Sequence, residues 1–220
     1  MKKQNNKQGF TIIEVVLVLA IAGLIFLMVF VALPSLQRSQ RDTQRRNDMA
    51  RVDTALTQYQ TNNQNTNGGT NLPTEGAVAP TDKSDYTGCE AKSTDSACQF
   101  LRRYMNAGDD TAAALNEFQD ADGTYYGISI TKFGNAVQTA SDATFTYGLA
   151  LTTSTEKDSE NNKVAETSSY EYTGTTVMDH VIYIIVSGKC DGEKAVKGSN
   201  RDYAVLYRLE GSGVYCIDNR

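Results

Sequence analysis

The side chains that usually carry out enzymatic or metal chemistry are sparse in this sequence. Its 220 residues include a single histidine, His180, which follows Asp179 at the start of an apolar stretch. A lone histidine in such a place is more often a packed or surface residue than a ligand. The sequence contains no Cys-x-x-Cys pair, no paired-histidine spacing and no glycine-rich phosphate loop. We therefore predict no catalytic residue, no cofactor-binding residue and no enzymatic activity.

One acidic segment could hold a cation. The sequence Asp-Ala-Asp-Gly at residues 120–123 follows Asp109 and Asp110. Carboxylate oxygens are the ligands that calcium prefers, but the downstream bidentate glutamate that closes an EF-hand loop is missing. We interpret the segment as a simple turn and assign no metal ligand, with a calcium site as the alternative.

Glu14 is the carboxylate in the least ordinary place, because it lies near the start of an almost unbroken apolar run from Phe10 to Leu33. The uncharged part, Val15 to Leu33, would span roughly 28 Å as a helix, close to the hydrocarbon thickness of a bilayer. A carboxylate costs about 2.5 to 3.5 kcal/mol at the centre of a bilayer and less near its surface. Glu14 therefore either finds a partner or lies at the headgroup level.

Charges on both sides of the apolar run bear on its orientation. Lysines precede it at positions 2, 3 and 7, and arginines follow it at positions 38, 41, 45 and 46. The formal net charge is -5 and those lysines contribute +3, so the rest of the chain sums to -8. We predict a cytoplasmic N-terminus and an acidic exterior part, which disfavours general nucleic-acid binding. A conventional secretory signal, cleaved near Val31–Ser35, is the alternative.

The residues around Glu14 form a motif. A short lysine-rich leader ends in Gly9, Phe10 follows, and Glu14 is the fifth residue counted from Phe10. This arrangement resembles the processing site of type IV prepilins. The resemblance implies that a membrane prepilin peptidase cleaves between Gly9 and Phe10 and that the same enzyme N-methylates Phe10. It also implies that Glu14 directs assembly by neutralising the Phe10 amine of an adjacent subunit, inside a filament core where unpaired charges are costly.

The same resemblance implies two environments for the subunit. Before assembly it would be a single-pass membrane precursor, and afterwards one copy in a helical homo-oligomeric filament at the cell surface. The implied partners are the prepilin peptidase and methyltransferase, the assembly platform with its cytoplasmic ATPase, and minor pilins, while nucleic-acid binding is left open. Gly23 and Pro34 are the helix-weakening residues of the span, and in this family a segment between such residues melts on assembly.

We expect an α+β pilin fold, with a long N-terminal helix packed on a C-terminal antiparallel sheet. The expected divisions are a cleaved leader (residues 1–9), a membrane and filament-core helix (10–34), an amphipathic helix (35–63) and a β-rich head (64–220). In the amphipathic helix, three- and four-residue spacing predicts one apolar stripe, formed by Met49, Val52, Leu56 and Tyr59.

Charges in the same helix have two interpretations. Asp42 precedes Arg45 by three residues and Asp48 precedes Arg51 by three, which favours pairs within the helix. The functional interpretation is that Arg38, Arg41 and Arg45 share a face that meets acidic surfaces of neighbouring subunits or anionic lipid headgroups.

A short helix and five strands are predicted in the head. The helix covers Asp95–Met105, after a stretch that looks irregular up to about Thr94. Aromatic and β-branched residues predict strands at Tyr125–Ile130, Phe145–Leu151, Val181–Val186, Tyr203–Leu209 and Val214–Ile217. The sequence at 210–213, Glu-Gly-Ser-Gly, makes the last two a hairpin. The Ser/Thr-rich stretch Thr152–Thr167 is expected to form an exposed loop.

Four cysteines, Cys89, Cys98, Cys190 and Cys216, follow the apolar run. An even number outside the membrane suggests disulfides formed in an oxidising compartment, and four cysteines allow three connectivities. Because pilins often close a C-terminal loop with a disulfide, the resemblance favours Cys190 with Cys216, which leaves Cys89 with Cys98.

These observations favour a structural subunit of a type IV pilus that supports adhesion, twitching motility or DNA uptake. A pseudopilin of a type II secretion system, or a minor pilin at a filament tip, shares the N-terminal motif and is the alternative. A signal-anchored extracellular domain with binding or enzymatic activity is the remote alternative.

Overall fold

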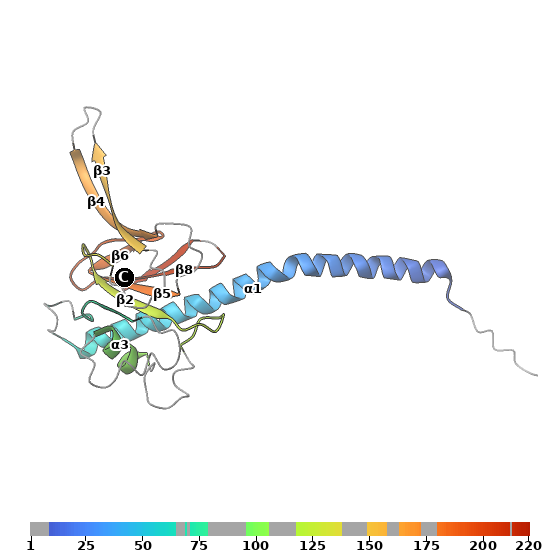
Figure 1. The fold of residues 1–220 in the computed structure, drawn as a ribbon, viewed down its shortest axis with the longest axis horizontal. Helices are drawn as coiled ribbons and strands as arrows, with labels where there is room; N and C mark the ends of the chain where they lie inside the picture. The colour runs from blue at the N-terminus through green and yellow to red at the C-terminus, as the bar shows by residue number, and fades with distance from the viewer. Residues whose placement is uncertain are drawn as a thin grey trace, which may run out of the picture. The chain divides into compact units, whose positions relative to one another are not determined.

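The computed structural model describes residues 9–64, 69, 71–78, 96–105, 118–137, 149–157, 163–172, 180–211 and 213–220. The chain divides into two compact units between Gln40 and Arg41. The first unit contains the N-terminal part of helix α1 (Ile12–Asn62), and the second contains the rest of α1 and the head. The predicted α+β arrangement, a long N-terminal helix followed by mostly antiparallel strands, is confirmed (Figure 1).

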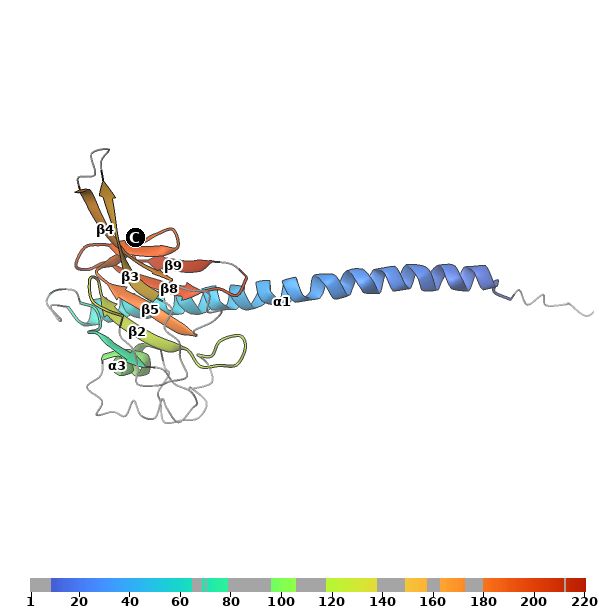
Figure 2. The same cartoon turned by 45° about the horizontal axis from the view of Figure 1, so that its top comes forward.

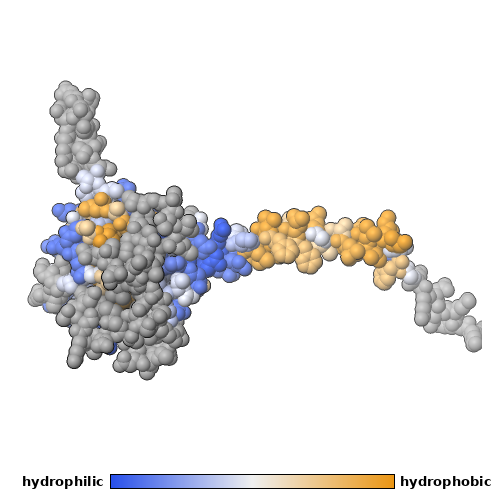
Figure 3. Space-filling model, viewed as in Figure 1, coloured by the Kyte–Doolittle hydropathy of each residue, from blue (hydrophilic) through white to orange (hydrophobic). Residues whose placement is uncertain are grey.

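Helix α1 is 51 residues long and continues through both Gly23 and Pro34. Its first part is apolar on all sides, and every large apolar side chain from Phe10 to Leu36 is exposed. Figure 3 shows this part in orange, followed by a hydrophilic part in blue. The boundary expected after residue 34 therefore lies within a continuous helix, and the four-part division stays a prediction.

The C-terminal part of α1 packs into the head through the predicted apolar stripe. Met49, Val52 and Leu56 are fully buried, and Tyr59 packs against the same core. Helix α3 (Ser96–Tyr104), close to the predicted range, adds Phe100 to this core. The three- and four-residue spacing of the stripe thus predicted the packing face correctly.

A five-stranded sheet faces this helical layer. Its order is β1-β2-β5-β8-β9, formed by β1 (Gly76–Val78), β2 (Gly127–Lys132), β5 (Val181–Val186), β8 (Tyr203–Arg208) and β9 (Val214–Asp218). All neighbouring pairs are antiparallel except β2 with β5, which is parallel. We expected an antiparallel sheet, and the structure differs at this one pair. The parallel pair arises because the chain leaves the sheet between β2 and β5 to build a second sheet.

The second sheet has the order β3-β4-β7-β6, formed by β3 (Leu149–Lys157), β4 (Lys163–Tyr172), β7 (Lys194–Lys197) and β6 (Gly188–Asp191). Strand β5 explains how the layers stack, because all six of its residues are buried. Ile182 and Ile184 belong to the core shared with α1, whereas Tyr183 and Ile185 belong to a second core with Tyr170 of β4. The five-stranded sheet therefore lies between the helices and the four-stranded sheet (Figure 2).

The prediction of an exposed loop at Thr152–Thr167 is wrong. Strands β3 and β4 form an antiparallel hairpin there, in one register from Leu149↔Tyr172 to Glu156↔Ala165, with a shift before the last pair, Lys157↔Lys163. The stretch has few apolar residues, so it shows no alternation of apolar and polar positions, but threonine has a high β propensity. Strands β1, β6 and β7 were also not predicted, and β1 lies in the stretch expected to be irregular.

The predicted strands at β5, β8 and β9 are confirmed, and so is the hairpin between β8 and β9. Strand β2 begins two residues later than expected, at Gly127, and ends at Lys132. Of the predicted strand Phe145–Leu151, the structure describes the part from Leu149, which opens β3.

Candidate assembly site

Glu14 caps the start of its own helix. Helix α1 begins at Ile12, and the backbone N–H and the Oγ1 hydroxyl of Thr11 both donate to Oε2 of Glu14, at 2.9 and 2.8 Å. The backbone N–H of Glu14 in turn donates to Thr11 Oγ1 at 3.4 Å. This reciprocal arrangement is a capping box, which satisfies backbone donors that the first turn leaves free. Within one subunit the Glu14 carboxylate therefore already has a partner.

Sequence reasoning missed Thr11, although the spacing Thr-x-x-Glu before an apolar run is typical of a capping box. Gly9 and Phe10 precede the helix, and the Phe10 side chain is 89% exposed. The structure thus places the predicted cleavage bond between Gly9 and Phe10 outside regular secondary structure, immediately before the helix start.

The apolar surface behind Glu14 has no covering in the described chain. The most apolar window of α1 has none of its residues buried, and this is a helix long and apolar enough to cross a membrane. Backbone polar groups inside such a helix are satisfied by its own hydrogen bonds, which makes it compatible with lipid. An apolar surface of this size in water marks a membrane or association site.

Gly23 and Pro34 lie within this helix. Proline lacks the backbone N–H that would bond to the preceding turn, and glycine has the lowest helix propensity after proline. Next to Pro34, the Ser35 hydroxyl donates to the carbonyl of Ala32 at 2.9 Å. Melting between the two positions on assembly stays a prediction.

Behind the apolar part, the head end of α1 is held by a buried group of charges. Arg45 is fully buried, and its Nε and Nη2 donate to the two carboxylate oxygens of Asp120, both at 2.7 Å. Its Nη1 lies 3.2 Å from Asp42 and 3.3 Å from Glu210. The Asp42 carboxylate accepts the backbone N–H groups of Glu210 and Gly211, at 2.9 and 2.8 Å. One arginine on α1 thus contacts the turn before β2 and the turn between β8 and β9.

The proposed exposed arginine face is therefore wrong for Arg45, which points into the head and not toward a neighbour or lipid. Arg41 is also engaged, since it makes two hydrogen bonds to the Glu210 carboxylate. The pairs expected within the helix are present, with Asp42 at 3.2 Å from Arg45 and Asp48 at 3.6 Å from Arg51. Helical spacing could predict the local pairs but not the distant partner Asp120.

His180 joins the same network. Its Nδ1 lies 3.2 Å from Asp120 and its Nε2 lies 3.6 Å from Asp122. Residues 120–123 form a turn as predicted, because the Asp120 carbonyl accepts the N–H of Gly123 and the Asp120 N–H donates to Thr124. The histidine is thus a packed residue, again as predicted.

Burial by itself would raise the pKa of the Asp120 carboxyl, but hydrogen bonds from His180 and Arg45 outweigh it and hold that pKa below its usual range. Burial also opposes the charge of Arg45, and the bonds and charge of Asp120 outweigh it, so the pKa of Arg45 is raised. The hydrogen bond to Asp120 raises the pKa of His180.

The charges do not suit a metal site. Asp120, Asp122 and His180 place their ligand atoms within 4.8 Å of one another. Both Asp120 oxygens, however, already accept hydrogen bonds from the buried Arg45 cation. A calcium ion would have to displace or repel this arginine, so we do not propose a cation here.

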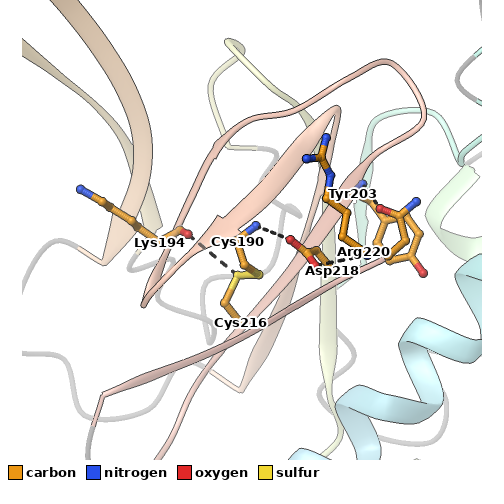
Figure 4. The surroundings of a disulfide bond; sticks show 7 residues. Cys190, Lys194, Tyr203, Cys216, Asp218 and Arg220 are labelled. Atoms are coloured by element: carbon orange, nitrogen blue, oxygen red, sulfur yellow. Dashed lines mark hydrogen bonds between the residues drawn. A yellow bond between two sulfur atoms is a disulfide. The ribbon is translucent and has the colours of Figure 1, made fainter.

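The disulfide expected between Cys190 and Cys216 is present, with the two Cα atoms 5.8 Å apart. Cys190 lies in β6 and Cys216 in β9, so the disulfide joins the edge strands of the two sheets. Figure 4 shows the Cys190 backbone N–H donating to the Asp218 carboxylate beside it, at 2.8 Å. Cys89 lies outside the described residues, so its pairing with Cys98 stays a prediction.

Comparisons with known proteins agree with the N-terminal geometry. Residues 4–30 match the family described as the prokaryotic N-terminal methylation motif, a range that includes Gly9, Phe10 and Glu14. Searches of curated proteins and of solved structures gave no match. The matched motif, the long apolar helix and the α+β head are consistent with a type IV pilin-like prepilin, a structural class anchored in the membrane by a single N-terminal helix.

Proposed function

We propose that this chain is a structural subunit of an extracellular type IV pilus. The observation that carries the proposal is a long helix whose apolar surface is fully exposed and whose start holds a single carboxylate, Glu14, within a matched methylation motif. The same surface can be buried in lipid before assembly and against identical helices afterwards, so extraction costs little hydrophobic free energy.

Hydrolysis of the Gly9–Phe10 peptide bond by a prepilin peptidase would release the leader and create an amine on Phe10. N-methylation keeps a basic nitrogen there. In the filament, this amine would pair with Glu14 of an adjacent subunit, because an unpaired charge in an apolar core is heavily penalised. The Glu14 carboxylate would then give up part of its hydrogen bonding with Thr11 to bind the Phe10 amine of the neighbour. This amine is available only in the assembled filament, so the pair would form only on assembly.

Other partners of the subunit would be the assembly platform, its cytoplasmic ATPase and minor pilins. The disulfide and the charged, polar exterior of the head suit an oxidising extracellular environment. Adhesion, twitching motility and DNA uptake are the roles that such a filament would support.

Mass spectrometry of filaments sheared from the cell surface tests the proposal. The expected N-terminal peptide begins with N-methyl-Phe10, followed by Thr11. An N-terminus at Met1 or near Ser35, with the protein missing from the sheared fraction, would contradict the proposal and favour an anchored or secreted domain. Methylated protein that stays in the membrane fraction would favour a pseudopilin.

A further inference from the structure

A pocket with a volume of about 330 Å³ lies at the C-terminal end of helix α1. This volume is within the range of small-molecule sites, roughly 300 to 1,000 Å³. Some of its lining residues come from the last turns of α1, and the others follow the helix or precede β8. They are Thr57, Gln60, Thr61, Gln64, Asn71 and Arg201. All of them belong to the described residues of the head.

The side chains that line this pocket are polar throughout. The hydroxyls of Thr57 and Thr61 and the carboxamides of Gln60, Gln64 and Asn71 provide both hydrogen-bond donors and acceptors. The remaining lining residue is an arginine, and no acidic residue is among the lining residues that the structure describes. Such a surface suits a ligand that carries hydroxyl groups, since a hydroxyl both donates and accepts, together with one negative group.

Hydrogen bonds hold the frame of the pocket in place. Nε2 of Gln60 donates to the backbone carbonyl of Arg201 at 2.7 Å, and Nδ2 of Asn219 donates to the same oxygen at 3.0 Å. The hydroxyls of Thr57 and Tyr203 lie 3.1 Å apart. The Arg201 side chain is exposed and takes part in none of the ion pairs between described residues. The backbone of Arg201 is thus fixed against α1, while its guanidinium is available to a ligand.

Asn71 has an unmet hydrogen-bonding group at this pocket. The residue is 6% exposed, and its Oδ1 is buried with no hydrogen-bond partner in the described part of the chain. A buried acceptor without a donor costs free energy, and such groups are normally paired in folded proteins. The last torsion of an asparagine side chain is soft, so a small rotation of the amide presents this oxygen to a donor in the pocket. A hydroxyl group of a ligand supplies such a donor.

We infer that this pocket binds a saccharide unit that carries a carboxylate. Hydroxyls of the sugar pair with the carboxamides of Asn71 and Gln60, and the carboxylate pairs with the guanidinium of Arg201, whose fork of N–H donors matches two carboxylate oxygens. Binding at this pocket needs one head and no filament, so it goes beyond the proposed function.

Three small probes separate the hydroxyl and carboxylate contributions. D-Glucuronate carries both kinds of group, D-glucose has the hydroxyls alone, and acetate has the carboxylate alone. Each is titrated by saturation-transfer NMR into the full-length chain in detergent. We expect saturable binding of glucuronate, weaker binding of glucose and none of acetate. No saturable signal from glucuronate would overturn the inference, and acetate that binds as tightly as glucuronate would mean an anion site without a saccharide.

Asn71→Gly tests the buried carboxamide. The φ angle at Asn71 is 56°, in the left-handed region, which glycine adopts without steric cost. The variant removes an unpaired buried oxygen, so its melting temperature should not fall. We expect about tenfold weaker binding of glucuronate, because the site loses a hydrogen bond to the sugar. Unchanged binding would contradict the assignment of the pocket.

Arg201→Gln tests the carboxylate contact. Gln60 bonds to the backbone carbonyl of Arg201, so this variant keeps the frame of the pocket. We expect the preference for glucuronate over glucose to fall by about fivefold, with glucose binding unchanged, because an exposed ion pair is lost. Lys197→Gln is the matched control, since Lys197 is exposed and does not line the pocket. Equal effects of the two substitutions would refute an acidic saccharide as the ligand.

Discussion

Arg45 on helix α1 and Asp120 in the turn before β2 form a two-point ion pair, with both N–O distances at 2.7 Å and both side chains shielded from solvent. Seventy-five positions separate them in the sequence. The pair holds the part of α1 from Arg41 onward in a defined rotation within the head, because a guanidinium and a carboxylate joined by two parallel bonds tolerate little change in angle.

Removing one partner of this pair should destabilise the head strongly. Arg45→Met leaves the Asp120 carboxylate buried without its cation, and we expect the free energy of unfolding to fall by about 3 to 5 kcal/mol. The double variant Arg45→Met/Asp120→Leu should recover part of that loss, because neither charge of this pair then stays buried. Chemical denaturation followed by circular dichroism measures both.

Arg51→Met is the matched control. Arg51 is 43% exposed on its side chain and lies 3.6 Å from Asp48. Because the Arg51 end of this pair is open to solvent and the contact is longer, we expect this variant to lose much less stability than Arg45→Met. Equal losses from Arg45→Met and Arg51→Met would contradict the role assigned to burial.

His180 should make the stability of the head depend on pH. Its pKa is raised in the folded protein, chiefly by the hydrogen bond to Asp120. Its contribution is therefore complete below the unfolded pKa of about 6.5 and is lost as the pH rises through the folded pKa. The lowered pKa of Asp120 acts in the opposite direction, since its contribution is lost as the pH falls below about 4. Stability should be highest between these limits.

His180→Asn tests the first of these two effects. Asparagine tolerates the positive φ of 47° found at position 180, so the backbone is not put under new strain. Melting temperatures of this variant should show a smaller decline between pH 6 and pH 8 than those of wild type. An unchanged decline would mean that another group titrates in that range.

Removing the Cys190–Cys216 disulfide should destabilise the head. The two residues are 26 positions apart, and closing a loop of this length is worth about 2 to 4 kcal/mol. The double variant Cys190→Ser/Cys216→Ser should show this loss in chemical denaturation. Cys216→Ser alone should lose as much, since one cysteine cannot close the loop. A double variant as stable as wild type would show that the sheets hold their edges together without it.

Glu14→Ala should leave an intact, membrane-inserted subunit that no longer assembles efficiently alone. Filament in the sheared fraction is the measurement, and membrane-fraction protein is the check on insertion. Thr11→Val keeps the carboxylate but removes the Oγ1 contacts of the capping box. If charge neutralisation drives assembly, this variant should assemble far better than Glu14→Ala. Wild-type filament levels from Glu14→Ala protein would refute the pairing.

Much of the fold could be predicted because it depends on short-range patterns. The spacing of Met49, Val52 and Leu56 predicted the buried face of α1, and the β-branched and aromatic residues of β5 predicted a strand. The hairpin of β3 and β4 could not be predicted in this way, because its residues alternate neither in polarity nor in charge. Its strands are defined by their pairing, which depends on chain segments coming together.

The sequence by itself determined the N-terminal site, where every element is local. Gly9, Phe10 and Glu14 lie within one helical turn of the helix start, and the apolar run that follows needs no tertiary contact to form a helix in lipid. Tertiary structure alone decided that Arg45 is buried against Asp120, that β2 and β5 are parallel, and that β3 pairs with β4. The physical reason is that the burial of a charge and the pairing of a strand depend on partners distant in the chain. Helical spacing and strand alternation do not encode such partners.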